Sequence, residues 1–214
     1  MIDMEFSAAI FDLDGTLIES NSVWAKIDRI ILEKRKIRCS EDFANKLSSM
    51  TYEDAAEEMH KLGVTESTEE LIKEFNELAV REYRYNIFLK EYAAEYLEFL
   101  KNRGVKIALA TASPRELYEP VLRHNSIYRY FDVFCTTNEA GKSKDHPDIY
   151  LLAASRLGVS PEDCAVFEDV LKGIISAKNA GMTAIGVYDR YSSEDIVTIR
   201  ASADKFIMNF SEMM

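Results

Sequence analysis

Hydrophobic and polar residues follow two kinds of pattern along the chain. Short apolar runs bounded by turn residues are typical of buried strands, and apolar residues spaced by three or four positions are typical of amphipathic helices. The strand pattern occurs at residues 8–11, 105–111, 131–136, 164–167, 183–187 and 205–208. The helical pattern occurs at residues 22–36, 40–49, 51–62, 67–85, 94–102, 114–124, 148–157, 171–179 and 193–200.

The order of these elements predicts the fold class and the domain organisation. From about residue 89 onward strands and helices alternate, which favours a mostly parallel sheet covered by helices on both faces. Residues 20–88 show only the helical pattern and interrupt this alternation directly after the first strand. We therefore predict a doubly wound α/β core domain of residues 1–19 and 89–214, with an inserted all-helical domain at residues 20–88.

Two carboxylates follow the first predicted strand, in the segment Asp12-Leu-Asp14-Gly-Thr. Residues i and i+2 of an extended chain face the same side, so both carboxylates can converge on one point. At about 4 Å apart and an effective dielectric near 20 they repel by roughly 4 kcal/mol, which favours a divalent cation beside them. An Asp-Gly hairpin turn is the alternative, but it explains Asp14 and leaves Asp12 unexplained.

Further polar residues follow other predicted strands. Ligands of open α/β sheets bind beyond the carboxyl ends of the strands, where Thr111, Glu168 and Asp169 stand, with Lys144 a little further along the chain. Lys142 competes with Lys144 for the same role. Ser113 precedes Pro114, and we interpret it mainly as a helix N-cap. An N-cap is also the alternative for Asp169.

These residue types suit phosphoryl transfer through a carboxyl phosphate. Asp12 is the candidate nucleophile, and Asp14 is the candidate acid that protonates the leaving alkoxide and later activates water. Thr111 and Lys144 are candidates for holding the phosphate. Oxygen ligands suit Mg²⁺, and the predicted metal-binding residues are Asp12, Asp14, Glu168 and Asp169. The predicted substrate-binding residues are Thr111, Ala112, Ser113 and Lys144.

Charge and composition narrow the partners. The 214 residues carry a net charge of −11, which argues against nucleic acid or an anionic membrane as the main partner. The sequence shows no signal-peptide pattern and no apolar stretch of 18 residues. Three cysteines, an odd number, argue against a disulfide framework. We expect a cytoplasmic monomer or weak homodimer that acts on a small phosphorylated metabolite.

Four segments together resemble a known family. Phe11–Leu17 resembles the first motif of the haloacid dehalogenase-like (HAD) superfamily hydrolases, residues 109–113 the second, residues 144–148 the third and residues 167–169 the acidic motif, with Gly173 beyond it. The resemblance is to the helical-cap subclass, which includes phosphoglycolate phosphatase-like and β-phosphoglucomutase-like proteins. It implies a Rossmann-like core, a helical cap that closes over the site, Mg²⁺, and an aspartyl-phosphate intermediate on Asp12.

The resemblance also leaves three functions open. A phosphatase is favoured, because the family's dehalogenases and phosphonate-cleaving members lack the second aspartate that stands here as Asp14. A β-phosphoglucomutase-like mutase is the second reading, although Tyr52 aligns where those mutases carry an arginine. A non-catalytic binding or regulatory protein is the third.

Asp145 replaces the usual proline after the motif lysine. We interpret the aromatic residues near and within the insertion as packing residues rather than a substrate-stacking site: Trp24, Tyr83, Tyr85 and Phe88.

Overall fold

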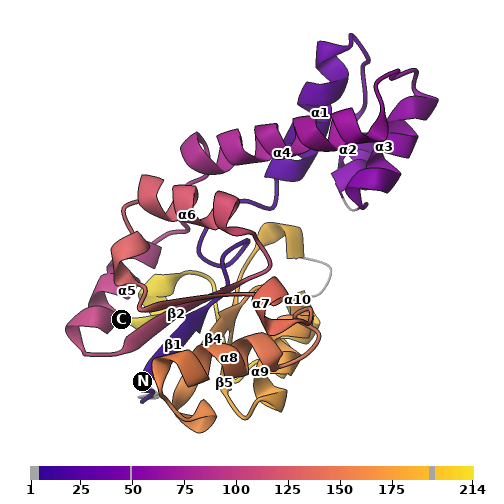
Figure 1. Ribbon diagram of the computed structural model, residues 1–214. Coiled ribbons are helices and arrows are strands. Elements are labelled where there is room, and N and C mark those ends of the chain that lie inside the picture. Colours follow the sequence, from indigo (N-terminus) through magenta and orange to yellow (C-terminus); the bar gives the residue numbers. More distant parts are fainter. Residues whose placement is uncertain (1–4, 49, 193–195) are drawn as a thin grey trace. The chain divides into compact units, whose positions relative to one another are not determined.

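The computed structural model describes residues 5–48, 50–192 and 196–214. The chain divides into two compact units, which are described separately below (Figure 1). The first unit comprises Met1–Glu19 and Phe88–Met214 and is called the core unit. The second comprises Ser20–Ile87 and is called the helical unit. None of the described helices is both long and apolar enough to cross a bilayer.

A six-stranded sheet organises the core unit. Its order is β3-β2-β1-β4-β5-β6, and every neighbouring pair is parallel, which confirms the predicted α/β class. The chain leaves the central strand β1 in one direction to β2 and β3 and in the other to β4, β5 and β6, so β1 lies at a topological switch point. The strands are β1 Ala8–Phe11, β2 Lys106–Thr111, β3 Val133–Thr136, β4 Cys164–Glu168, β5 Thr183–Val187 and β6 Lys205–Ile207.

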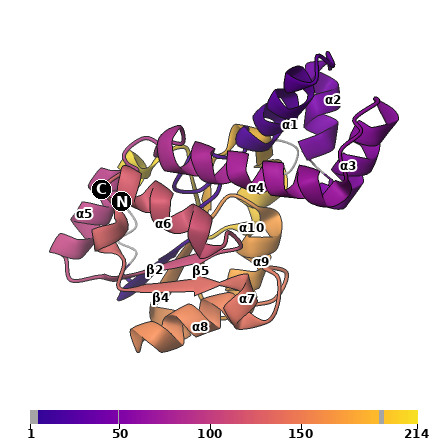
Figure 2. The same ribbon diagram turned by 45° about the horizontal axis from the view of Figure 1, so that its top comes forward.

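Helices cover the two faces of this sheet (Figure 2). Ile10 and its neighbours on adjacent strands pack against α8 and α9 on one face. On the other face Phe11 stacks on Phe167 at 4.5 Å between ring centroids, and Tyr96 of α5 closes this aromatic layer. The core helices are α5 Ala93–Asn102, α6 Arg115–His124, α7 Thr137–Ala140, α8 Asp148–Leu157, α9 Leu171–Asn179 and α10 Ile196–Ser202.

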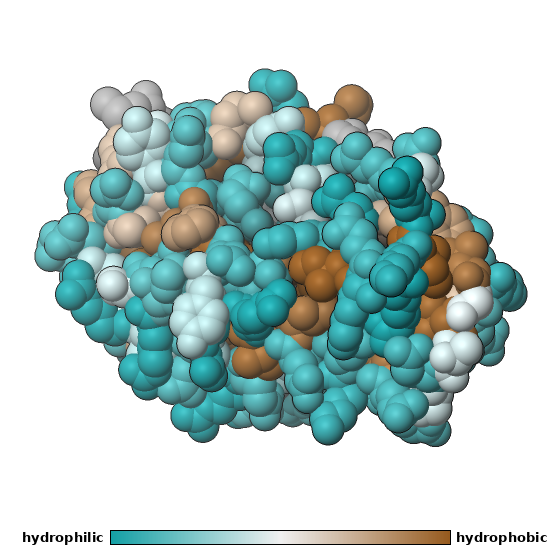
Figure 3. All heavy atoms as spheres, turned by 90° about the horizontal axis from the view of Figure 1, so that it is seen from above, coloured by the Kyte–Doolittle hydropathy of each residue, from teal (hydrophilic) through white to brown (hydrophobic). Residues whose placement is uncertain are grey.

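The described residues of the helical unit form four helices with their own apolar core. Ile27, Ile31 and Phe75 are among its buried residues. Thr51 caps α3 through its side chain, and Ser67 and Glu70 form a reciprocal capping box at the start of α4. The helices are α1 Val23–Lys34, α2 Glu41–Ser48, α3 Tyr52–Lys61 and α4 Thr68–Tyr85. The face of the molecule in Figure 3 is mainly hydrophilic, with smaller apolar areas between the polar side chains.

The two connections to the helical unit leave the core unit side by side. The Glu19 amide donates to the Phe88 carbonyl at 3.0 Å, and the Lys90 amide donates to the Leu17 carbonyl at 2.9 Å. Lys90 also donates through its ammonium to the buried Asp189 carboxylate at 2.8 Å. The insertion therefore begins only a few residues after Asp14, from a point that backbone and ion-pair contacts hold in place.

Some sequence expectations need correction. The short helix α7 was not predicted, since four residues cannot display a 3.6-residue period. The packing interpretation holds for Tyr83, which is fully buried, but it is wrong for Tyr85 and Phe88, which are 57% and 62% exposed. Ser49 and residues 193–195, which the patterns assign to helices, lie outside the described residues.

Candidate active site

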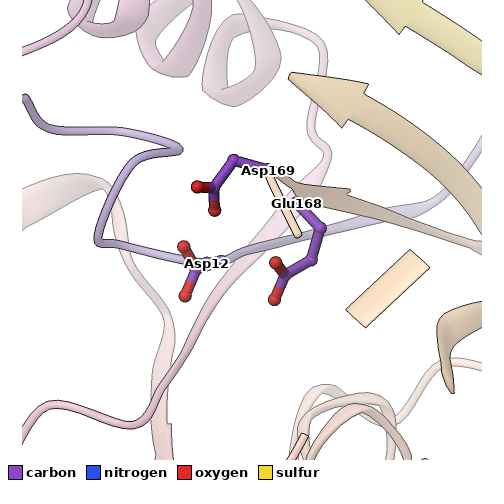
Figure 4. A group of neighbouring side chains, drawn as sticks. All are labelled: Asp12, Glu168 and Asp169. Atoms are coloured by element: carbon purple, nitrogen blue, oxygen red, sulfur yellow. The ribbon is translucent and has the colours of Figure 1, made fainter. Parts of the chain in front are cut away.

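Three buried carboxylates converge at the carboxyl ends of two neighbouring strands. Asp12 follows β1, and Glu168 and Asp169 stand at the end of β4. The Asp12 amide donates to the Phe167 carbonyl at 3.0 Å, so the pairing of β1 with β4 continues to this point. One oxygen from each side chain lies within 4.8 Å of the others (Figure 4). Strand pairing therefore brings together residues that are more than 150 positions apart.

Lys144 joins this cluster from the loop before α8. Its ammonium donates to Asp12 Oδ1 and, at 2.5 Å, to Glu168 Oε1. The competing Lys142 lies elsewhere, with its ammonium 3.9 Å from an oxygen of Asp148. Despite Asp145 in place of the usual proline, the loop directs Lys144 into the carboxylate cluster.

The charges of Asp12, Glu168, Asp169 and Lys144 do not balance one another. With the three carboxylates ionised and Lys144 protonated, the net charge is −3 + 1 = −2. Burial raises the pKa of Asp12 well above its ordinary value; Lys144 opposes this, and Glu168 adds to it. Burial also disfavours the charged form of Lys144, but Asp12 and Glu168 outweigh it and raise the pKa of the ammonium.

A divalent cation fits this set of residues. Asp12 Oδ2 and Glu168 Oε2 are buried and accept no hydrogen bond from any described residue. Unpartnered buried carboxylate oxygens are costly unless a cation or a donor reaches them. Oxygen ligands with a combined excess charge of −2 suit a hard cation such as Mg²⁺. The residues available to hold it are Asp12, Glu168 and Asp169.

Asp14 lies outside this group of three and is oriented by a different contact. Its Oδ2 accepts a hydrogen bond of 2.7 Å from the Ser113 hydroxyl. The interpretation of Ser113 as a helix N-cap is therefore wrong, since Pro114 occupies the N-cap position of α6 and Ser113 turns to Asp14 instead. The buried Thr111 hydroxyl accepts from the Ser113 amide at 2.9 Å and keeps its own proton to donate. Ala112, between them, is exposed.

Three further residues support the carboxylates. Tyr150 donates to Glu168 Oε1 at 2.8 Å, and Thr16 donates to Asp169 at 3.2 Å. Gly173 in α9 leaves room for the Glu168 side chain, because a Cβ there would lie 2.5 Å from Glu168 Cδ. The alternative of an N-cap is wrong for Asp169, since Val170 occupies that position of α9. Tyr150 could not be identified from the sequence, because an aromatic residue in an apolar helix is interpreted as a core residue.

Comparison with known proteins identifies the family. A model of the haloacid dehalogenase-like hydrolases matches residues 6–181. The chain belongs to this family. The match includes all the motif residues of the site, from Asp12 to Asp169. The resemblance inferred from the four motifs is thereby confirmed.

Individual relatives of this haloacid dehalogenase-like hydrolase carry two kinds of name. It is 31% identical to a "Phosphorylated carbohydrates phosphatase" of Thermotoga maritima over 179 residues, 83% of each chain. It is 33% identical to a "Beta-phosphoglucomutase" of Bacillus subtilis over 189 residues, 84% of this chain and 82% of that one. The crystal structure of a putative β-phosphoglucomutase from Thermotoga maritima superposes with a TM-score of 0.83 at 29% identity, covering 94% of both chains.

Proposed function

We propose that this hydrolase is a Mg²⁺-dependent phosphatase that cleaves a small phosphomonoester through an aspartyl-phosphate on Asp12. The observation that supports the proposal is that two carboxyl groups, two residues apart in the sequence, have different surroundings. Asp12 is buried among cationic and anionic groups with one oxygen unpartnered. Asp14 is only partly buried and is held by the Ser113 hydroxyl. Asp12 therefore suits attack on phosphorus, and Asp14 suits proton transfer.

In the first step an oxygen of Asp12 attacks phosphorus, and the bond from phosphorus to the ester oxygen breaks. Asp14 in its acid form gives its proton to that oxygen, and the alcohol leaves. In the second step Asp14, now a carboxylate, takes a proton from water as the water oxygen attacks phosphorus. The bond from phosphorus to Asp12 breaks, and inorganic phosphate is released.

The surrounding residues assist both steps. Lys144 holds Asp12 in place and supplies positive charge beside the phosphoryl oxygens. Thr111 has a hydroxyl proton to donate to those oxygens. When bound at Asp12, Glu168 and Asp169, Mg²⁺ reduces the repulsion between these carboxylates and the phosphate. We further propose that the helical unit, inserted directly after this motif, acts as a cap.

The comparisons also favour a second candidate, a sugar-phosphate mutase, because one of the relatives carries that name. A mutase must hold a second phosphate, which calls for a cationic group in the part that grips the substrate. The resemblance to the family aligns Tyr52 where those mutases carry an arginine, and this supports hydrolysis over phosphate transfer between positions of one sugar.

The test is phosphate release from a panel of phosphomonoesters, with Mg²⁺ and with EDTA. We expect release that requires Mg²⁺ and that falls at least 10³-fold, an order-of-magnitude expectation for loss of a nucleophile, in Asp12→Asn. Lys144→Ala and Lys142→Ala form a matched pair from the same loop. Loss in the first and retention in the second supports the assigned role of Lys144.

Full activity of Asp12→Asn would refute the proposed nucleophile. Interconversion of two sugar phosphates that depends on a bisphosphate, without net phosphate release, would establish the mutase instead. Binding of Mg²⁺ without turnover of any ester would favour a binding protein on this fold.

A further inference from the structure

The helical unit contains a pocket of its own, lined by residues of α1, α2, α3 and α4 and by Met50. Its cavity measures about 170 Å³. Trp24 and Asp28 line it from α1, Tyr52 from α3 and Phe75 from α4. We call it the aromatic pocket. Trp24, which the sequence assigned to packing, is half-buried and borders this space.

Asp28 is the unusual member of the aromatic pocket. It is 2% exposed, and no hydrogen bond or ion pair is found for its carboxyl among the described residues. Glu82 is the other buried acid of the helical unit, and it shows the usual arrangement. It accepts from Lys26 at 2.5 Å and from Asn86 at 3.0 Å. Burial without such partners raises the pKa of Asp28 to about 7.

A buried carboxyl that borders a cavity and lacks a partner destabilises the fold, so a ligand that satisfies it gains the interaction the fold does not provide. The aromatic rings limit what that ligand can be. Tyr52 stacks on Phe75 at 5.2 Å, and Trp24 lies 6.1 Å from Tyr52. The faces of such rings attract cations, and Trp does so most strongly.

We propose that the aromatic pocket binds the ammonium group of a small organic amine, such as an amino alcohol or an amino sugar. The residues that line the pocket all belong to the helical unit. The inference therefore goes beyond the proposed phosphatase function and does not rest on it.

Ammonium fits better than the two alternatives. A hydroxyl group donates to Asp28 but brings no charge and gains nothing from the ring faces. A second phosphate would face a carboxyl and three aromatic rings with no cation among the described lining residues. Only an ammonium supplies hydrogen-bond donors, the opposite charge and the cation–π attraction together.

Trp24 provides a direct measurement, because it is the only tryptophan in the chain. Its fluorescence is titrated at pH 8 with ethanolamine and, as the neutral counterpart, ethylene glycol. The proteins are the full chain, Asp28→Asn and Glu82→Gln, with EDTA present so that turnover plays no part. We expect a saturable response to ethanolamine, at least a tenfold weaker one to ethylene glycol, and a tenfold loss of ethanolamine affinity in Asp28→Asn but not in Glu82→Gln.

Circular dichroism verifies that each variant is folded, so that a weaker response reports a lost contact with the ligand.

The outcomes separate this inference from the phosphatase proposal. A response of Trp24 to ethanolamine that depends on Asp28 supports the ammonium site, whether or not any ester is hydrolysed. Equal responses to the amine and the glycol overturn the ammonium site and leave the phosphatase standing. An ethanolamine response that is unchanged in Asp28→Asn likewise overturns the inference, and the wild-type comparison needs no variant at all.

Discussion

Tyr150 donates a hydrogen bond of 2.8 Å to Oε1 of Glu168, the same oxygen that accepts from Lys144. The tyrosine is fully buried, and burial first, with the Glu168 charge second, raises the pKa of its hydroxyl well above the ordinary value. It therefore stays a neutral donor throughout the working pH range. Two donors on one oxygen leave the other, Oε2, unpartnered among the described residues. Tyr150 thus orients Glu168 towards the cation site.

The first prediction is that Tyr150→Phe weakens both Mg²⁺ binding and turnover. A hydrogen bond to a charged group contributes about 1.5–3 kcal/mol, so we expect at least a tenfold change. The measurements are the Mg²⁺ concentration at half-maximal phosphate release and the Mg²⁺-induced shift in Tm. Tyr118→Phe is the control, since Tyr118 stacks on Phe134 and, among the described residues, makes no hydrogen bond to Asp12, Glu168 or Asp169. Equal Mg²⁺ dependence in both variants would show that Tyr150 only packs.

The elements and the carboxylate motifs could be predicted because local patterns encode them. The bounds of α8, α9 and β5 agree with their predicted ranges to the residue. Each has a clear period or an apolar run with a breaker at its end, such as Gly158 after α8. Asp12 could be identified for a related reason, because a carboxylate directly after an apolar strand is unusual: carboxylates are rarely buried.

The supporting contacts could not be predicted, because they depend on the three-dimensional fold. Tyr150 and Glu168 are 18 positions apart, Ser113 and Asp14 are 99, and Thr16 and Asp169 are 153. From the sequence alone, a serine before a proline is interpreted as a helix N-cap. Only the adjacency of β1 and β2 brings its hydroxyl to Asp14 and gives it another role.

The second prediction concerns this Ser113 contact. Ser113→Ala removes the 2.7 Å hydrogen bond that orients Asp14 and leaves the backbone bond from the Ser113 amide to Thr111 in place. We expect kcat to fall about fivefold to thirtyfold, in line with about 1–2 kcal/mol for one such bond, with the Mg²⁺ requirement unchanged. Steady-state kinetics over a range of Mg²⁺ concentrations measures both quantities. An unchanged kcat would mean that Asp14 needs no orienting partner.

The third prediction is that Asp28→Asn stabilises the free protein at high pH. The pKa of Asp28 is raised from 3.8 to about 7 by burial, so the folded state binds more protons than the unfolded state between these values. Stability therefore falls as pH rises from about 4 to 7 and then levels off. The titratable groups that sense Asp28 are Tyr52 and Cys39, and burial raises the pKa of both further above this range.

Asparagine cannot ionise, so this loss of stability should be absent from the variant. We expect its free energy of unfolding to exceed that of the wild type by about 4 kcal/mol at pH 8, and by only about 0.5 kcal/mol near pH 4, since one pKa unit corresponds to about 1.4 kcal/mol. Urea unfolding at the two pH values measures the difference. A variant less stable than the wild type at pH 8 would show that the carboxylate has a stabilising partner.

The fourth prediction tests the close approach of α9 to Glu168. In an ordinary helix, Gly→Ala stabilises by about 1 kcal/mol. In Gly173→Ala the new Cβ would lie 2.5 Å from Glu168 Cδ and 2.8 Å from its Oε1, so the carboxylate must move. We expect the variant to lose stability, by about 1–3 kcal/mol for overpacking, and to need more Mg²⁺ for activity. Thermal unfolding with and without Mg²⁺ measures both effects.

Ser176→Ala, on the same helix, is the matched control. The Ser176 hydroxyl is buried and has no hydrogen-bond partner among the described residues, so its removal should raise stability by about 1 kcal/mol or leave it unchanged. Its response to Mg²⁺ should equal that of the wild type. If Gly173→Ala were more stable than the wild type and equally responsive to Mg²⁺, the position of Glu168 would not depend on the missing side chain, and α9 would have no part in shaping the cation site.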